Sequence, residues 1–458
     1  MEKYQTSRYQ LEINEIAKGG PGGYESVYLN SEGDSATDEL YHLLEGFTGV
    51  FLPAENRSIR QRNSSQLVEA IKGGKSLGIA SGFKPSGAYH FGHKLTSGTV
   101  AFMQKNGVQV FMPVADLECD MDTKISKEDY MYWAADNLVD WGANGVNLDA
   151  SHVYLQSEEK RVSDIAYLVA RGLTFDLAVD TYGFKKMADE FPFLFAGITQ
   201  VGDIILPQHR DFGNYHSFMV SGQDQDGHMK MTVELAKRAF DSKISLLGIQ
   251  TIPSGFYIPH IRGIIGKASS SKPEATLYLG SGPLREDLEG RIKTSLQKLD
   301  SAMENPDLRS NLEKASLDVV RYIEYFNSLS KINFGDALKN IPADIANEIK
   351  TSDDSDKSYL IDDYLLNECK SARQDNIQLV RETISEALKD HQRKRQVILD
   401  YAVERENYRD LGAWTMDSER AEEPDFWKVP DESKVNQNLR NRTQWFNMVA
   451  SMKDKIVP

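Results

Sequence analysis

The chain has 458 residues, 40% hydrophobic and 26% charged, a composition typical of a globular protein with a buried core, and its length predicts about three domains. No apolar run reaches the ~18 residues of a membrane span, and Met1–Gln5 start no apolar signal segment, so we expect neither membrane insertion nor export. The net charge of −15 argues against indiscriminate nucleic-acid binding, and two cysteines exclude a disulfide framework and favour a reducing cytoplasm.

The first elements with a clear pattern follow an N-terminal extension, residues 1–75, that carries no recognisable chemistry. Residues 76–80 have the pattern of a short strand, and a loop and a helix that stops near residue 106 come next. Residues 108–114 are nearly all apolar, as in a parallel strand buried on both faces, although Pro113 lacks an N–H. This strand–helix–strand unit predicts a doubly wound sheet.

The same alternation continues downstream in looser form. A helix is expected from Ser126, whose hydroxyl can cap it, strands at 152–155 and 217–220, and a helix at 228–240. Long charged helices follow residue 283, the clearest at 377–405. We therefore predict an α/β fold with three parts: an N-terminal extension (1–75), a Rossmann-like doubly wound parallel-sheet catalytic domain with a connective insertion (76–284), and a C-terminal α-helical domain (285–458).

Two histidines stand where the first predicted strand's loop enters its helix, in the segment H-F-G-H at residues 90–93. A helix N-terminus presents unpaired N–H groups and a partial positive charge, so phosphates bind there readily. Gly92 would let a flat ring approach the backbone, and His90 and His93 could both donate to one phosphate chain. Two ordinary surface histidines are the alternative, which the preceding strand and Pro-Ser-Gly loop disfavour.

A second candidate segment is K-A-S-S-S, residues 267–271, in a loop of small residues. One lysine and three hydroxyls suit a pyrophosphate leaving group, and such a loop could close over a nucleotide. Serine-rich loops with a lysine are common, so this segment gains its weight from its pairing with the histidines upstream.

Together the two segments resemble the H-I-G-H and K-M-S-K-S motifs of class I aminoacyl-tRNA synthetases. The loop departs from the common form at Ala268 and at Ser270, and tryptophanyl-tRNA synthetases often lack the second lysine too. The resemblance implies that His90, His93 and Lys267 are catalytic. It implies an ATP site, with Mg²⁺ carried by the nucleotide, formed by Gly82, Pro85, Ser86, Gly87, His90, Gly92, His93, Asp224, Lys267, Ser269, Ser270 and Ser271.

A third segment, D-Q-D at residues 224–226, resembles the D-Q-D-P-H/Y element of archaeal and eukaryotic tryptophanyl enzymes. The resemblance implies that Gln225 contacts the α-amino group of the amino acid and that Asp224 lies near it or near the ATP ribose. The carboxyl edge of a parallel sheet is also where ligands bind on physical grounds. An acidic turn before a helix is the plain alternative.

Two further residues resemble the family's amino-acid site. Gln200 matches a glutamine that faces the indole N–H, and Asp116 matches an acidic position after the second strand. A buried acceptor for the indole N–H would discriminate against phenylalanine. In the family a tyrosine side chain shares this contact with the indole, and it has no clear counterpart here after residues 156–158. The substrate amino acid could therefore also be tyrosine.

The segment H-Q-R-K-R-Q, residues 391–396, resembles the H-Q-x-R-R segment in the last long helix of tryptophanyl enzymes. Arg393, Lys394 and Arg395 are therefore predicted to contact tRNA phosphates. A solvated helix face explains the same pattern equally well. No metal-ligand spacing appears in the sequence, and Cys119 is expected to be inert packing.

The resemblance implies ATP-dependent activation of L-tryptophan to tryptophanyl-adenylate, and its transfer to tRNA(Trp), by a cytoplasmic homodimer. Such chemistry needs positioning and charge stabilisation rather than a side-chain nucleophile. Three alternatives stay open: a tyrosyl-tRNA synthetase, a nucleotidyltransferase, and a non-catalytic RNA-binding paralogue. The long helical segment disfavours the second, and the intact His90, His93 and Lys267 disfavour the third.

Overall fold

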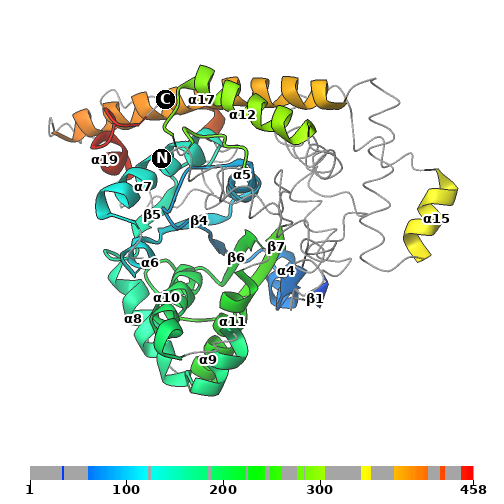
Figure 1. Ribbon diagram of the computed structural model, residues 1–458. Helices are drawn as coiled ribbons and strands as arrows, with labels where there is room; N and C mark the ends of the chain where they lie inside the picture. Colours follow the sequence, from blue (N-terminus) through cyan, green and yellow to red (C-terminus); the bar gives the residue numbers. More distant parts are fainter. Residues whose placement is uncertain are drawn as a thin grey trace.

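A computed structural model defines the arrangement of the elements (Figure 1). The structure describes residues 34–35, 60–121, 125–182, 187–222, 225–242, 248–258, 276–282, 284–304, 342–351, 376–410, 423–428 and 445–456. Asp224 and the whole Lys267 loop, with Ser269, Ser270 and Ser271, lie outside these residues.

The described strands form one sheet of seven in the order β1-β2-β7-β6-β3-β4-β5. The five from β7 to β5 are parallel, and β2 and β1 extend the β7 edge in antiparallel pairing. This arrangement confirms the predicted α/β fold and the predicted strands. The bounds are β1 (Asp34–Ser35), β2 (Arg60–Arg62), β3 (Leu77–Ala80), β4 (Gln109–Val114), β5 (Ser151–Leu155), β6 (His216–Gly222) and β7 (Ser254–Ile258).

Helices cover both faces of the sheet (Figure 1). In that view α5, α7, α12, α17 and α19 lie above the sheet and α8 to α11 below it, and each group has its own cluster of buried apolar side chains. The bounds are α4 (Ser64–Lys72), α5 (Phe91–Lys105), α6 (Asp116–Met121), α7 (Lys127–Ala143), α8 (Lys160–Val169), α9 (Phe175–Tyr182), α10 (Met187–Ile205), α11 (Asp226–Asp241), α12 (Leu288–Met303), α15 (Ala343–Thr351), α17 (Asn376–Asp410) and α19 (Trp445–Ala450).

Local signals set several of these boundaries. The Ser126 hydroxyl accepts from the Asp129 N–H at 3.1 Å and caps α7, as the sequence predicts. Helix α5 ends at the Asn106 cap, and Gly107 follows with a φ of 91°, a conformation that favours glycine. The predicted strand and helix types are therefore correct in this part of the chain.

The order of the strands creates a switch point between β3 and β6. From β3 the chain winds outward through β4 to β5, and it then returns to the other side of β3 to form β6 and β7. Loops that leave neighbouring strands in opposite directions open a crevice at the carboxyl ends, where ligands bind in doubly wound sheets. The loop after β3 leads to His90, and the loop after β6 leads to Gln225.

The buried core crosses both of the expected domain boundaries in the described residues. Strand β2 and helix α4 lie within the segment 1–75, yet β2 pairs with β7 and Leu67 of α4 joins the main core cluster. Ile384 of α17 and Trp445 of α19 belong to that same cluster. The division of the chain into three domains remains a prediction. None of the described helices is both long and apolar enough to cross a bilayer.

Candidate active site

The loop after β3 lies directly against β4. The Phe83 N–H donates to the Pro113 carbonyl at 3.1 Å, and a Cβ at Gly82 would lie 1.9 Å from that carbonyl oxygen. Only glycine permits this approach. Because β3 ends at Ala80, Pro113 is tolerated inside β4 although it has no N–H to donate.

Two further contacts fix the rest of that loop. The Ser86 N–H donates to the Lys84 carbonyl at 2.8 Å and tightens the turn after Pro85. The Asn137 side chain of α7 donates to the Gly87 carbonyl at 3.1 Å. The predicted ATP-binding loop is therefore held from both the sheet side and the α7 side.

The start of α5 is closed by its two histidines. His90 Nδ1 accepts from the Gly92 N–H at 3.1 Å, and His93 Nδ1 accepts from the His90 N–H at 3.3 Å, which forms a reciprocal capping box. The two rings stack with centroids 3.8 Å apart. Since both Nδ1 atoms accept, each neutral ring carries its proton on Nε2, the nitrogen that would donate to a phosphate.

Gly92 has a more specific role than the sequence predicts. A Cβ at this position would lie 2.8 Å from Cε1 of the His90 ring. The ring of His90 thus lies against the Gly92 backbone, and a part for Gly92 in ATP binding remains a prediction. The glycine between the histidines is what lets His90 fold back over the helix end.

At the β6 side the structure brings two predicted residues together. Gln200 of α10 donates from Nε2 to Gln225 Oε1 at 3.1 Å, where α11 begins. Beside them the Tyr182 hydroxyl lies 3.0 Å from His228 Nδ1, and a Cβ at Gly197 would lie 2.4 Å from that hydroxyl. Polar side chains of α9, α10 and α11 therefore converge after β6.

A partly buried ion pair anchors the start of α11. Asp226 accepts from Arg62 Nε at 2.9 Å and from Arg62 NH2 at 2.6 Å, and the Tyr257 hydroxyl donates to it at 2.6 Å. The hydrogen bond to Asp226 raises the pKa of Arg62, so the guanidinium stays charged. Arg62 of β2 lies in the segment 1–75, where the sequence shows no recognisable chemistry. The fold brings it to Asp226, the residue after Gln225.

A family profile described as tRNA synthetases class I (W and Y) matches residues 72–352. The chain belongs to this family. Among curated relatives, a tryptophan–tRNA ligase of Methanocaldococcus jannaschii is 33% identical over 229 residues, 49% of this chain and 60% of the relative. One from Methanopyrus kandleri is 32% identical over 234 residues, 48% of this chain and 58% of the relative. Each match thus spans about three fifths of the relative's length.

Solved structures of tryptophanyl-tRNA synthetases have a similar fold. The enzyme from Aeropyrum pernix superposes with a TM-score of 0.55 at 23% identity, covering 77% of this chain and 88% of that one. The enzyme from Encephalitozoon cuniculi gives 0.56 at 16% identity, covering 81% and 95%. These likenesses support the fold, and the archaeal relatives confirm the resemblance to archaeal tryptophanyl enzymes.

Asp116 has hydrogen-bond partners of its own within the chain. Its carboxylate accepts from the Ser157 N–H at 3.1 Å and from the Ser157 hydroxyl at 2.5 Å. These bonds tie the end of β4 to the loop after β5. A part for Asp116 in amino-acid binding remains a prediction.

Asp203 is a buried polar residue near the candidate site that the sequence alone did not indicate. It lies three residues after Gln200 on α10 and is buried, and it accepts from the Tyr154 hydroxyl at 2.8 Å and from Gln156 Nε2 at 2.6 Å. Burial raises the pKa of Asp203 to about 7, against the two hydrogen bonds that lower it. The Gln-x-x-Asp spacing on one helix is the sequence signal that could have revealed it.

The prediction that Arg395 contacts tRNA is wrong. Its side chain is 0% exposed and is paired with Asp136 at 2.6 Å and with Asp140, both on α7. The helical period places His391, four residues earlier, on the same inner face of α17, and it is buried as well. Neither residue belongs to a solvated helix face.

The other two residues of the basic run differ from Arg395. The Arg393 side chain is 75% exposed, and Lys394 is partly exposed and pairs with Asp390 at 2.8 Å. Contacts of Arg393 and Lys394 with tRNA phosphates remain predictions.

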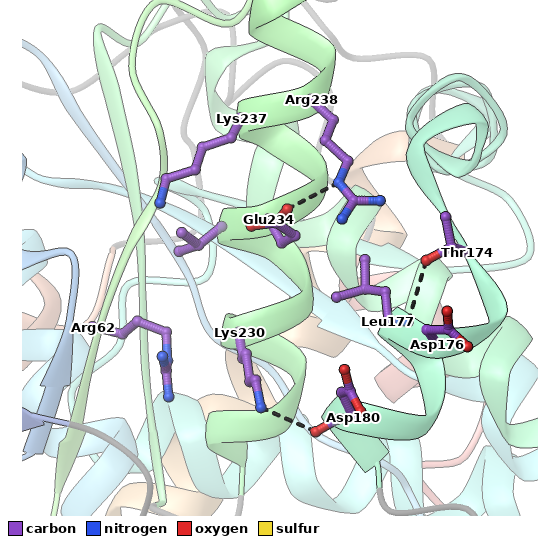
Figure 2. Close-up of a pocket in the computed structure, with 10 residues that line it drawn as sticks. Arg62, Thr174, Asp176, Leu177, Asp180, Lys230, Glu234, Lys237 and Arg238 are labelled. Carbon is purple, nitrogen blue, oxygen red and sulfur yellow. Dashed lines mark hydrogen bonds and ion pairs between the residues drawn. The ribbon is translucent and has the colours of Figure 1, made fainter.

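A pocket of about 400 Å³ lies between α9 and α11 (Figure 2). Its charges are largely engaged with nearby groups: Arg238 pairs with Glu234 at 2.9 Å, and Lys230 donates to the Asp180 carbonyl at 3.0 Å. None of the predicted ATP or amino-acid residues lines it. The pocket borders the candidate site through Arg62, the partner of Asp226.

Proposed function

We propose that this protein activates L-tryptophan with ATP to form tryptophanyl-adenylate and transfers the tryptophanyl group to tRNA(Trp). The observation that carries the proposal is that the predicted phosphate-binding residues and the predicted amino-acid-binding residues lie at the same edge of the sheet. The histidine-capped start of α5 follows β3, the Gln200–Gln225 pair lies after β6, and β3 and β6 are paired neighbours. Family membership and relatives named tryptophan–tRNA ligases point the same way.

In the activation step a tryptophan carboxylate oxygen bonds to the α-phosphorus of ATP, and the bond from that phosphorus to the leaving pyrophosphate breaks. Negative charge builds on the α-phosphate, where the α5 N-terminus and the Nε2–H groups of His90 and His93 would stabilise it. Lys267, with Ser269, Ser270 and Ser271, would hold the pyrophosphate. Mg²⁺ would arrive on the ATP phosphates, a common way for this ion to bind at nucleotide sites.

The orientation of the glutamine pair fits a tryptophan substrate. Gln200 uses its Nε2–H to bond Gln225, which leaves its Oε1 as the acceptor for an indole N–H. Gln225 would contact the α-amino group, and Asp224 would lie near that group or the ribose. Tyrosine has a hydroxyl that both donates and accepts, so this acceptor alone does not exclude it.

Helices α8, α9 and α10 carry exposed aromatic side chains that are suited to contact with a second copy of the chain. Tyr167 of α8, Phe175 of α9 and Phe195 of α10 are 81%, 54% and 58% exposed. Large exposed aromatic side chains are typical of association surfaces. We propose a cytoplasmic homodimer that uses these helices, with tRNA(Trp) as the third substrate and Arg393 and Lys394 among its contacts.

Pyrophosphate exchange into ATP, measured with each of the twenty amino acids, tests the proposed reaction. We expect exchange with tryptophan alone. Exchange with tyrosine would favour a tyrosyl enzyme, and no exchange with any amino acid would favour a non-catalytic RNA-binding paralogue.

The Lys267→Ala variant tests the role given to the lysine loop. We expect adenylate formation to fall by two or more orders of magnitude, roughly the effect of removing a charge-stabilising group, while tryptophan binding survives. Lys160→Ala is the matched control, because that lysine is exposed on α8 and pairs only along its own helix. A Lys267→Ala exchange rate within a few-fold of wild type would overturn the assignment.

A further inference from the structure

A buried cluster of charged side chains joins α17 to α7. Arg395 donates to Asp136 at 2.6 Å and also to Asp140, and His391 Nε2 lies 2.8 Å from the same Asp140 carboxylate. Arg291 of α12 is buried beside them. The cluster belongs to neither of the two loops of the proposed active site, yet it contacts the chain next to both.

The first link runs to the histidine motif through Tyr89. Its ring stacks on His391 with centroids 5.7 Å apart and an angle of 8°, and it lies 5.4 Å from the His93 ring. Tyr89 directly precedes His90, and its hydroxyl lies 2.5 Å from the Ser97 hydroxyl of α5. Its buried ring is therefore wedged between α17 and the start of α5.

The second link runs to residues 276–282, which follow the Lys267 loop in the sequence. The N–H groups of Leu279 and Gly280 donate to the Tyr89 carbonyl at 3.1 and 3.2 Å, and the Ser281 hydroxyl donates to Asp136 at 3.1 Å. A Cβ at Gly280 would lie 2.5 Å from Asp140 Oδ2, so this segment lies directly against the cluster.

Both carboxylates of the cluster pair with the Arg395 guanidinium. Burial raises the pKa of Asp136 and of Asp140, and the charge of Arg395 lowers both. Burial lowers the pKa of His391 well below its usual value, with Lys94 and Arg395 lowering it further. A neutral His391 donates one hydrogen bond to Asp140 and presents a flat face to Tyr89. Loss of the Arg395 guanidinium would leave both carboxylates without their partner in the core.

We propose that His391 and Arg395 are positioning residues of the activation reaction. Acting through Asp140, Asp136 and Tyr89, they hold the start of α5 and residues 276–282 in the relative placement that ATP requires. The inference rests on the proposed function for its kinetic readout. It gives the buried part of the H-Q-R-K-R segment a role in nucleotide binding instead of tRNA binding.

Two substitutions at His391 separate the ring from the hydrogen bond. His391→Gln keeps a donor toward Asp140 and removes the ring from Tyr89, whereas His391→Phe keeps a ring and removes the donor. We expect each to raise the KM for ATP in pyrophosphate exchange about tenfold, while the KM for tryptophan stays within about twofold. Gln396→Ala, at an exposed position of the same helix, is the control and should match wild type in both constants.

At Arg395 the matched pair is Arg395→Lys and Arg395→Met. The lysine variant keeps the charge and should recover part of the ATP affinity that the methionine variant loses. If Arg395→Met does not fold, the His391 variants and Arg395→Lys carry the test. Variants in which kcat falls with the melting temperature while both KM values stay at the wild-type level would show that the cluster only stabilises the fold, and would overturn the proposal.

ATP affinity measured by calorimetry without an amino acid provides a second readout. One outcome is that the wild type catalyses pyrophosphate exchange with no amino acid but binds ATP, and that the His391 variants bind ATP more weakly. This outcome would refute the proposed reaction and support the positioning role. His391 variants that fold and bind ATP within twofold of wild type would refute the positioning role alone. A wild-type protein that does not bind ATP would refute both.

Discussion

The two helix starts at the β3–β6 edge are built in opposite ways. Helix α5 begins with a cap made within four residues, because His90 Nδ1 accepts from the Gly92 N–H and His93 Nδ1 accepts from the His90 N–H. Helix α11 has no side-chain cap at Gln225 and is anchored by Arg62 and Tyr257, far away in the sequence. The cap of α5 is thus made locally, whereas the anchor of α11 depends on the completed sheet.

This difference decides what substitution does at each place. A change in the α5 cap acts on one turn of helix, so its cost in stability should be that of a cap. A change in the α11 anchor leaves a buried carboxylate uncompensated and loosens the contact between β2 and the sheet. We therefore expect a substitution in the α11 anchor, at Arg62 or Tyr257, to displace Gln225 more than a substitution in the α5 cap displaces the rest of that helix.

Gly82→Ala has the largest expected effect on stability. The added Cβ would lie 1.9 Å from the Pro113 carbonyl oxygen, so the loop must leave β4 and give up the Phe83 hydrogen bond. We expect a loss of about 3 kcal/mol in the free energy of unfolding, measured by urea titration. Gly227→Ala, in the first turn of α11, is the control, because its Cβ would meet nothing closer than 3.5 Å. A Gly82→Ala variant as stable as Gly227→Ala would show that the loop is not held there.

Arg62→Met tests the anchor of α11. Asp226 would lose its bidentate partner, and because Arg62 is partly exposed we expect a cost of about 2 kcal/mol in unfolding free energy rather than the full cost of a buried pair. The affinity for the amino acid should fall as Gln225 shifts. Adding Asp226→Asn to Arg62→Met should recover part of the stability, since no charge is then left unpaired. A double variant less stable than Arg62→Met would contradict this account.

Lys94 adds another distant contact of α5 to those that Tyr89 makes just before the helix. Its ammonium is buried and donates to Asn144 Oδ1 at 2.7 Å. Burial lowers its pKa to about 7, Lys394 lowers it further and Asp390 opposes the shift. The unfolded chain therefore binds the proton more tightly, and the penalty for a buried Lys94 is largest below pH 7 and shrinks as the pH rises toward the unfolded pKa.

The stability of wild type relative to Lys94→Met should accordingly rise by about 2 kcal/mol between pH 7 and pH 9. Urea unfolding of both proteins at several pH values measures this difference. The protonation of side chains that both proteins share cancels in it. His391, Asp390 and Lys394 of α17 and Lys105 of α5 are the nearby titratable groups, and all are retained in the variant. A difference that stays constant or falls between pH 7 and pH 9 would contradict a buried Lys94 with a lowered pKa.

The same contrast explains how far the sequence could be interpreted. The β3–α5 unit was predictable because its strand, loop glycine and capping histidines are neighbours in the chain. The prediction for Arg395 is wrong because charge patterns do not show which face of a helix meets buried acids, and Asp136 and Asp140 are far away in the sequence. Arg62 was missed for the same reason, since only the pairing of β2 with β7 brings it to Asp226.

The smallest expected change in stability concerns His90, where two substitutions separate its capping role from its proposed role toward phosphate. Asparagine at this position can still accept from the Gly92 N–H, whereas alanine cannot, so His90→Ala should be about 1 kcal/mol less stable than His90→Asn. Both lose the Nε2–H donor, and both should slow pyrophosphate exchange by a similar factor of about 100. If His90→Asn kept most of the exchange activity, the local cap and not the imidazole would be what the reaction needs at the start of α5.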